Sequence, residues 1–296
     1  MKLAAISGAL FLALSSTSAL AECGANSRQA DVTCFGASPD TAADSAPAIN
    51  AAAREAVSQH VPLVIPAGRY KVGSTIDIDY AEAADTGIEV QANGAILDGA
   101  AAGVSPVLYI HCSGGSSQSP KGCFYFHLAG TLHVYANSGW GAVIGDWTLA
   151  DAQNSIKIEQ LDVNNAKGSG LLLGYLLNSD VFAVANAGTG AIALWLNQVQ
   201  FSTIRGAAAA HQGWAIYMGD GYTFANTLQA LDLEESDWCL VNLHDAVTHN
   251  TFVSPYFNCQ NGLYSTAGSA NLLLNPMFGG AVQQQGYFPE GFKVLQ

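Results

Sequence analysis

Five acidic residues lie within 18 consecutive positions, and no basic residue falls among them: Asp220, Asp232, Glu234, Glu235 and Asp237. Asp232 and Glu234 are two positions apart and alternate with Leu231 and Leu233, as in a half-buried strand. Their side chains would then share the outward face, with backbones roughly 6.5–7 Å apart.

Two neighbouring carboxyl groups suit the cleavage of glycosidic bonds. One carboxyl must stay protonated to donate to the leaving oxygen, and one carboxylate must attack or activate water. Crowded like charges raise one another's pKa, which keeps one acid protonated. We therefore predict Asp232 and Glu234 as catalytic residues, with Asp220, Glu235 and Asp237 tuning them or binding substrate. The alternative interpretation is a solvated strand face and its corner.

Aromatic residues recur in the same part of the chain and would suit a saccharide, whose C–H faces stack on aromatic rings. We expect Trp195 to fill the interior. The candidate substrate-binding residues are Trp214, Tyr217, Trp238 and Tyr256.

A repeat of about 24 residues must position these side chains. Asn-Thr-Leu at Asn226 returns as Asn-Thr-Phe at Asn250, and similar openings occur at Asn154, Asn178 and, loosely, Asn271. A fixed period in this range is typical of stacked repeats. Aligning the asparagines places Asp232 level with Tyr256 and Glu234 level with Asn258. A leucine-rich repeat and a β-sandwich are the alternative architectures.

The stretch before the repeats predicts a helix that begins at Asp44-Ser45 and ends at His60, followed by a strand at Leu63–Ile65. Phe35-Gly-Ala, this helix and the segment Val-Ile-Pro-Ala-Gly-Arg-Tyr ending at Tyr70 resemble the start of the pectate-lyase superfamily. The resemblance covers Phe35–Ile78. It implies an all-β, single-stranded, right-handed parallel β-helix with an N-terminal capping α-helix, and it extends to phage tailspikes.

The superfamily also includes lyases, in which an Arg or Lys acts as base and acids on neighbouring coils hold Ca²⁺. If Phe201 and Ile204 match Leu228 and Leu231, Arg205 lies beside Asp232 and could serve as such a base. A structural ion pair is the other interpretation of Arg205. We predict no metal or cofactor for a hydrolase, and Ca²⁺ for a lyase.

Residues 1–21 have one basic residue, Lys2, an apolar run and a small-residue end at Ala19-Leu-Ala21, which predicts a cleaved secretory signal peptide. One domain would then occupy residues 22–296, secreted to the outside or the periplasm. Removing Lys2 takes the net charge from −13 to −14, which argues against nucleic-acid or anionic-membrane partners. Six cysteines in an exported chain favour disulfides. Their close spacing predicts the pairs Cys23–Cys34, Cys112–Cys123 and Cys239–Cys259.

The sequence therefore predicts a secreted protein that acts on polysaccharide, with a glycosidase as the first hypothesis. A Ca²⁺-dependent lyase acting by β-elimination is the second. A non-catalytic carbohydrate-binding or tailspike-like module, which would be a trimer in the tailspike case, is the third.

Overall fold

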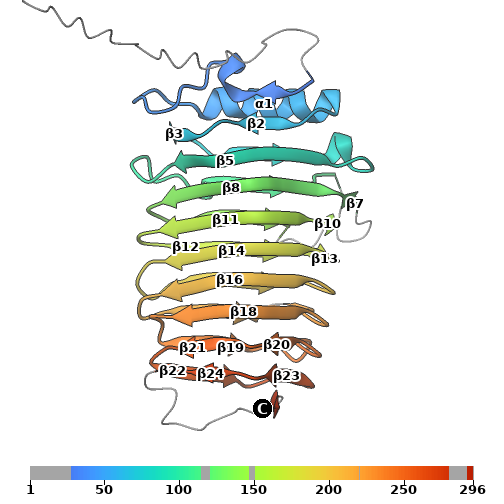
Figure 1. Ribbon diagram of the computed structural model, residues 1–296, viewed down its shortest axis with the longest axis vertical. Coiled ribbons are helices and arrows are strands. Elements are labelled where there is room, and N and C mark those ends of the chain that lie inside the picture. The colour runs from blue at the N-terminus through green and yellow to red at the C-terminus, as the bar shows by residue number, and fades with distance from the viewer. Residues whose placement is uncertain (1–27, 115–120, 147–150, 220, 280–291, 296) are drawn as a thin grey trace, which may run out of the picture.

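The computed structural model describes residues 28–114, 121–146, 151–219, 221–279 and 292–295. One α-helix, α1 (Ala46–Gln59), lies across the N-terminal end of a stack of strands (Figure 1). Two short 3-10 helices accompany it, η1 (Val32–Phe35) and η2 (Ala81–Ala83). As predicted, α1 ends at His60, which adopts φ 54°. At its start, Asp44 accepts the Ala46 N–H at 3.0 Å.

Twenty-five strands form three sheets, and every pairing among the described residues is parallel. Sheet A, with fourteen strands, contains β1 (Ala30–Asp31), β2 (Leu63–Ile65), β3 (Gly68–Lys71), β5 (Ile88–Asp98), β8 (Phe126–Ala136), β11 (Lys157–Asn165), β14 (Asp180–Ala187), β16 (Thr203–Ala210), β18 (Thr227–Glu234), β20 (Thr251–Val253), β21 (Tyr256–Asn258), β23 (Asn271–Leu274), β24 (Met277–Phe278) and β25 (Phe292–Leu295). Sheet B, with eight, contains β4 (Ile76–Asp79), β6 (Leu108–His111), β9 (Trp140–Gly145), β12 (Ser169–Gly174), β15 (Ile192–Asn197), β17 (Trp214–Met218), β19 (Trp238–Asn242) and β22 (Asn261–Ser265). Sheet C contains β7 (Lys121–Phe124), β10 (Asp151–Asn154) and β13 (Leu176–Leu177).

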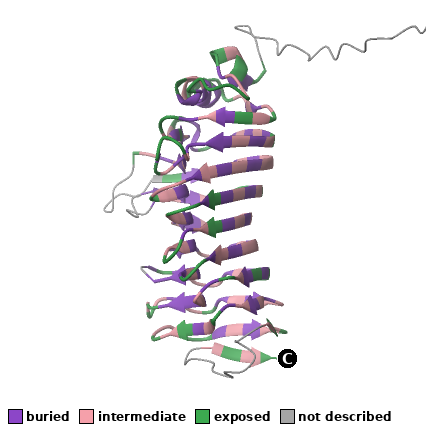
Figure 2. Cartoon of the chain, turned by 90° about the vertical axis from the view of Figure 1, so that its left-hand side faces the viewer, coloured by how far each residue is buried: buried purple, intermediate pink, exposed green. Residues whose placement is uncertain are grey.

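The stacked parallel strands make the fold the predicted parallel β-helix, with each coil contributing a rung to sheet A and a rung to sheet B (Figure 1). A β-sandwich is excluded because its sheets are antiparallel. Buried residues alternate with more exposed ones along the strands (Figure 2). The alternation arises because successive strand side chains point to opposite faces, so apolar side chains fill the interior of each coil.

The Pro-Ala-Gly-Arg-Tyr segment has a structural role at the N-terminal end. Tyr70 is fully buried, and its hydroxyl donates to the Pro66 carbonyl at 3.0 Å. This bond holds the turn between β2 and β3 beneath α1. The helix covers the first coil, whose apolar residues would otherwise face water.

A ladder of buried polar side chains explains the recurring asparagines. Asn226 donates from Nδ2 to Asn250 Oδ1 at 2.9 Å, and Asn250 donates likewise to Asn271 Oδ1 at 3.1 Å. Ser202 and Ser179 continue the ladder toward the N-terminus. The Ser202 N–H donates to Asn226 Oδ1 at 2.9 Å, and the Ser179 N–H donates to Ser202 Oγ at 3.0 Å. All five side chains are buried. They satisfy backbone groups at a corner that each coil repeats.

The predicted alignment of Asn154 and Asn178 with this ladder is wrong. Asn178 is exposed with φ 48°, and the ladder position belongs to Ser179. The residue before each ladder position adopts a left-handed conformation, as at Ala225 (φ 56°) and His249 (φ 58°). Asn178 is therefore the corner residue of its coil, and asparagine tolerates that conformation well.

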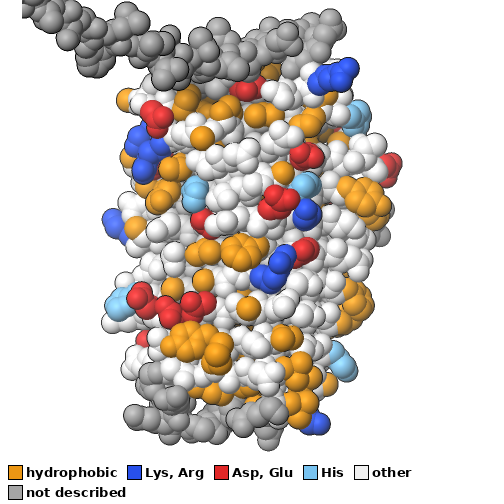
Figure 3. Space-filling model, in the orientation of Figure 1, with side chains coloured by type: hydrophobic (Ala, Val, Ile, Leu, Met, Phe, Trp, Pro, Cys, Tyr) orange, Lys and Arg blue, Asp and Glu red, His pale blue; other side chains and the backbone are white. Residues whose placement is uncertain are grey.

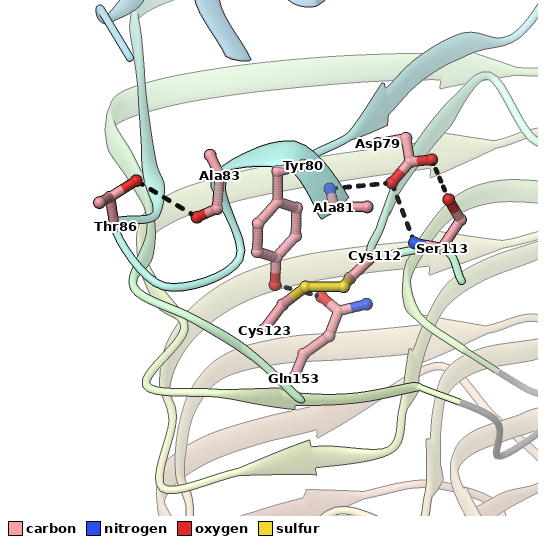
Figure 4. The surroundings of a disulfide bond; sticks show 9 residues. All are labelled: Asp79, Tyr80, Ala81, Ala83, Thr86, Cys112, Ser113, Cys123 and Gln153. Atoms are coloured by element: carbon pink, nitrogen blue, oxygen red, sulfur yellow. Dashed lines mark hydrogen bonds between the residues drawn. A yellow bond between two sulfur atoms is a disulfide. The ribbon is translucent and has the colours of Figure 1, made fainter. Parts of the chain in front are cut away.

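Two of the predicted disulfides are present, Cys112–Cys123 and Cys239–Cys259. The first lies beside Tyr80, whose hydroxyl donates to Gln153 Oε1 at 2.9 Å (Figure 4). Cys23, the partner predicted for Cys34, and the predicted signal peptide at 1–21 lie outside the described residues. Disulfides are typical of proteins in oxidising compartments. No helix among the described residues is both long and apolar enough to cross a bilayer.

Candidate active site on sheet A

Asp232 and Glu234 lie on β18, on the outer face of sheet A. Leu231 and Leu233 are buried in the coil interior, so the two acids point outward, as the alternation predicted. Asp232 is exposed and Glu234 is half-buried. Figure 3 shows a group of acidic side chains at this level of the stack, directly above hydrophobic side chains at the level of β21.

The environment of Asp232 favours its protonated form. Burial of the carboxyl raises its pKa above the ordinary value, and the negative charge of Glu234 raises that pKa further. The side chain as a whole is exposed, so an arriving ligand can reach the carboxyl. A proton donor beside a second carboxyl group is the arrangement that glycoside cleavage requires.

A shallow groove of about 400 Å³ lies next to this pair, over β16. It exists because β16 presents Gly206 and Ala207 between larger side chains of its neighbours. Ala207 pairs in register with Asp232, so the acid lies at the edge of the groove. The groove is lined by Phe182, Val184, Arg205, Gly206, Ala207, Gln229 and Ala230. We call it the β16 groove.

Gly206 is required at this position. It adopts φ 128°, and a Cβ atom there would lie 1.8 Å from the Ala183 carbonyl oxygen. The sequence reasoning missed the groove, although the run of one glycine and four alanines at 206–210 was a usable signal. Such a run leaves one strand without bulky outward side chains.

The predicted position of Arg205 beside Asp232 is wrong. Arg205 pairs with Gln229, and the register shifts before Ala207 meets Asp232. The shift arises because β18 has one more residue than β16 at this point, and Ala230 takes φ 49° to accommodate it. Arg205 donates from Nη2 to Asp180 Oδ1 at 2.6 Å, so it does form an ion pair, but with Asp180 and not with Asp232.

The remaining predicted acids lie at or beyond the end of β18. Glu235 is exposed and turns the chain toward sheet B with φ 52°. Asp237 follows in the same corner, and its N–H donates to the Gly213 carbonyl at 2.9 Å. Asp220 lies outside the described residues.

The candidate substrate-binding aromatic residues divide between two sheets, so most of them do not lie beside the acids. Tyr256, on β21, pairs in register with Asp232, as predicted. Trp214, Tyr217 and Trp238 lie on β17 and β19 of sheet B. Trp195 does not fill the interior: it is half-buried, and its ring lies 5.4 Å from the Tyr217 ring.

A second groove, of about 610 Å³, lies between α1 and β4 and was not predicted. Asp77 and Asp79 are two apart on β4 and both line it. Asp77 accepts from His111 Nε2 at 2.8 Å if that nitrogen is protonated. Burial raises the pKa of Asp79, but hydrogen bonds from Ser113 and the Ala81 N–H outweigh it and leave that pKa below its ordinary value. The pKa of Asp79 is therefore shifted in the opposite direction from that of Asp232.

Among the residues that the structure describes, no group of three or more His, Cys, Asp or Glu side chains is arranged to hold a metal ion.

No protein-family model matches the chain, and no curated protein matches its sequence. The structure is similar to that of the ORF18 protein of Geobacillus virus E2, with a TM-score of 0.57 at 13% identity over 84% of this chain and 52% of that one. It matches the Dettilon tailspike protein with a TM-score of 0.42 at 13% identity, over 84% of this chain and 62% of that one. It matches the A-module of the mannuronan C-5 epimerase AlgE4 of Azotobacter vinelandii with a TM-score of 0.38 at 15% identity, over 90% and 100%.

The chain therefore spans about half the length of the viral protein and less than two thirds of the tailspike. At these identities the likeness is one of fold. The chain has a parallel β-helix fold, as the resemblance of residues 35–78 predicted.

Proposed function

We propose that this protein acts on polysaccharide and cleaves glycosidic bonds at β18. The observation that carries the proposal is the raised pKa of Asp232 beside Glu234 on an accessible strand face. Glycoside hydrolysis needs two neighbouring carboxyl groups, and a raised pKa favours the proton-donor role for one of them. Secretion, with residues 1–21 as signal peptide, forms part of the same proposal.

In this mechanism Asp232 donates its proton to the glycosidic oxygen as the bond to the anomeric carbon breaks. Glu234 either attacks that carbon or removes a proton from the attacking water. Residues two apart on a strand have backbones roughly 6.5–7 Å apart. Their carboxyl groups can approach to the roughly 5–5.5 Å of a retaining enzyme or separate to the longer inverting distance.

The neighbouring strands would hold the sugars on either side of the broken bond. Tyr256 pairs in register with Asp232 on the C-terminal side and offers a ring for stacking. The β16 groove lies on the N-terminal side, with apolar Phe182 and Val184 along one wall. Adjacent strands are about 4.8 Å apart, so a saccharide that runs along the stack meets a new strand with almost every unit. Glu235 and Asp237 would adjust the charge near the pair.

The test is the release of reducing ends from a panel of polysaccharides, followed by Asp232→Asn and Glu234→Gln on the substrate that responds. Each substitution should lower the rate at least about 100-fold, the usual contribution of a positioned acid or base. Asp162→Asn is the matched control, because Asp162 lies on the outer face of β11 and pairs with His133 at 3.1 Å. If both β18 variants keep wild-type rates, the catalytic assignment is wrong.

The Ca²⁺-dependent lyase is the less supported enzyme, because the guanidinium of Arg205 is engaged by Asp180 and lies opposite Gln229. A lyase would release unsaturated products that absorb in the ultraviolet, and a Ca²⁺ chelator would abolish their release. The non-catalytic module has one observation in its favour: Asp232 lies on an open face with only a shallow groove beside it. Binding without any release of reducing ends would support that module.

A further inference from the structure

The outer face of sheet B differs in chemistry from that of sheet A. The six strands β9, β12, β15, β17, β19 and β22 contain no Asp, Glu, Lys, Arg or His. On sheet A, by contrast, ion pairs cross the strands, among them His133–Asp162 and Arg205–Asp180. In a chain with net charge −13, an uncharged face that crosses six strands is an unusual surface.

Six aromatic rings lie along this uncharged face. We call them the aromatic strip: Trp140, Trp195, Trp214, Tyr217, Trp238 and Tyr264. The Trp140 and Trp195 ring centroids are 5.5 Å apart, although β12 lies between their strands. Tyr217 contacts Trp195 at 5.4 Å and Trp214 at 5.1 Å.

The strip continues on the C-terminal side across β19 and β22. Trp214 and Trp238 pair in register on adjacent strands, and the Trp238 and Tyr264 rings are 5.2 Å apart. Tyr264 is 42% exposed, Trp238 is half-buried, and Tyr217 is the most covered ring of the set. The rings therefore cross the strands and follow the long axis of the stack.

We propose that the aromatic strip is a separate binding surface for a neutral polysaccharide, independent of the acid pair on sheet A. Two observations favour this occupant. The rings are all Trp or Tyr, which combine a flat apolar face for sugar C–H groups with a polar edge for sugar hydroxyls. The surface also carries no charge, so it complements an uncharged polymer and gives an anionic or cationic one no ion pair.

A second copy of the chain is a less suitable occupant, because two copies with a net charge of −13 repel each other. The acids of β18 lie on sheet A, and the chain turns through Glu235 and Asp237 before it enters β19 of sheet B. The strip would therefore hold the protein on a polymer whether or not β18 cleaves it. The inference does not rest on the proposed hydrolysis.

The test uses the full chain and affinity electrophoresis in gels that contain a neutral polysaccharide, such as a β-glucan, a xylan or a galactomannan. Tyr264→Ala removes the most exposed ring, and Trp238→Ala removes its neighbour. Each substitution should weaken the retaining association about tenfold, since one well-placed ring contact is worth roughly that factor. Tyr222→Ala is the matched control, because Tyr222 is 61% exposed and lies outside the strip.

Trp238 is half-buried, so Trp238→Phe is the second variant: it keeps the packing and should reduce binding by less than Trp238→Ala. Asp232→Asn should leave binding unchanged, which separates a failure of the strip from a failure of the catalytic proposal. Raising the salt concentration should also leave binding unchanged, because no ion pair is involved. The proposal is overturned if no neutral polysaccharide retards the protein, or if Tyr264→Ala and Tyr222→Ala bind alike. It is also overturned if sedimentation shows a dimer that Tyr264→Ala dissociates.

Discussion

Replacing Asn250 by alanine should strongly destabilise the fold, because this side chain lies in the middle of the buried ladder. Its Oδ1 accepts the Asn226 backbone N–H at 3.2 Å and the Asn226 Nδ2 at 2.9 Å. Its Nδ2 donates to the Thr223 carbonyl at 2.9 Å and to Asn271 Oδ1 at 3.1 Å. Asn250→Ala removes all four bonds in a site from which water is excluded.

The loss of folding free energy depends on which former partners of the Asn250 side chain keep another hydrogen bond. Thr223 O still accepts from Thr248 N–H, Asn271 Oδ1 still accepts from Asn250 N–H, and Asn226 Nδ2 still donates to Val199 O. Only the Asn226 N–H is left without an acceptor, at a cost of about 1–3 kcal/mol. The other lost bonds are worth about 0.5–1 kcal/mol each when their partners are satisfied elsewhere. We expect a total of about 2.5–6 kcal/mol.

The measurement is urea unfolding followed by two probes, together with hydrogen exchange at the Asn226 amide. That amide should exchange much faster in Asn250→Ala than in the wild type. Asn186→Ala is the control, because Asn186 is exposed on the outer face of β14 and should cost less than about 0.5 kcal/mol. If the two variants have the same unfolding midpoint, or if the Asn226 amide stays protected, the ladder does not stabilise the coils as we argue.

Three further predictions concern titration and backbone geometry. Hydrogen bonds from the Gly130 N–H, Lys157 and His127 lower the pKa of Glu159 to about 2 from an ordinary 4.5. Its stabilisation is therefore present above pH 4.5 and lost as the pH falls toward 2, so the stability difference between wild type and Glu159→Gln should close over that range, as urea midpoints will show. Glu234→Gln should lower the pKa of Asp232, measured by carbon NMR; an unchanged pKa would exclude coupling of the two groups. Gly206→Ala should destabilise the fold more than Gly94→Ala, because a Cβ at Gly206 meets the Ala183 carbonyl whereas one at Gly94 meets nothing within 4 Å. Gly94→Ala should cost only the backbone strain, roughly 1–3 kcal/mol. Equal urea unfolding midpoints for the two variants would contradict this.

The sequence predicted those features that depend on local pattern. The helix at Ala46–Gln59, the strand at Leu63–Ile65 and the outward direction of Asp232 follow from capping residues, turn residues and alternation. The pairings of Asp232 with Tyr256 and of Glu234 with Asn258 were also predictable. Paired residues of these two coils stay 24 positions apart along the whole rung, because neither coil has a residue inserted relative to the other. Within that coil pair, the period of 24 residues fixes the register.

The register between β16 and β18 was not predictable in the same way. The extra residue of β18 is Ala230, which adopts a left-handed conformation. Alanine is not typical of that conformation, so its presence in the sequence gives no indication of a bulge. The apolar pattern continues on both sides of it, because Leu228 and Leu231 are both buried. The prediction matched Ile204 with Leu231, whereas Ile204 pairs with Leu228, and Arg205 therefore lies opposite Gln229.

The same limit applies to the division of the aromatics between two faces. Trp238 is only four residues from Glu234, which made a common surface reasonable. The left-handed conformation of Glu235 ends the strand and turns the chain, so those four residues take it from sheet A to sheet B. In a β-helix, residues that are close in sequence therefore share a face only if they belong to the same strand. Proximity across coils, one period apart, is what brings Tyr256 to Asp232 and Trp214 to Trp238. A site built from several strands of this chain therefore has to be assigned from residues that pair in register across coils. By that criterion the acid pair and the aromatic strip are two separate surfaces.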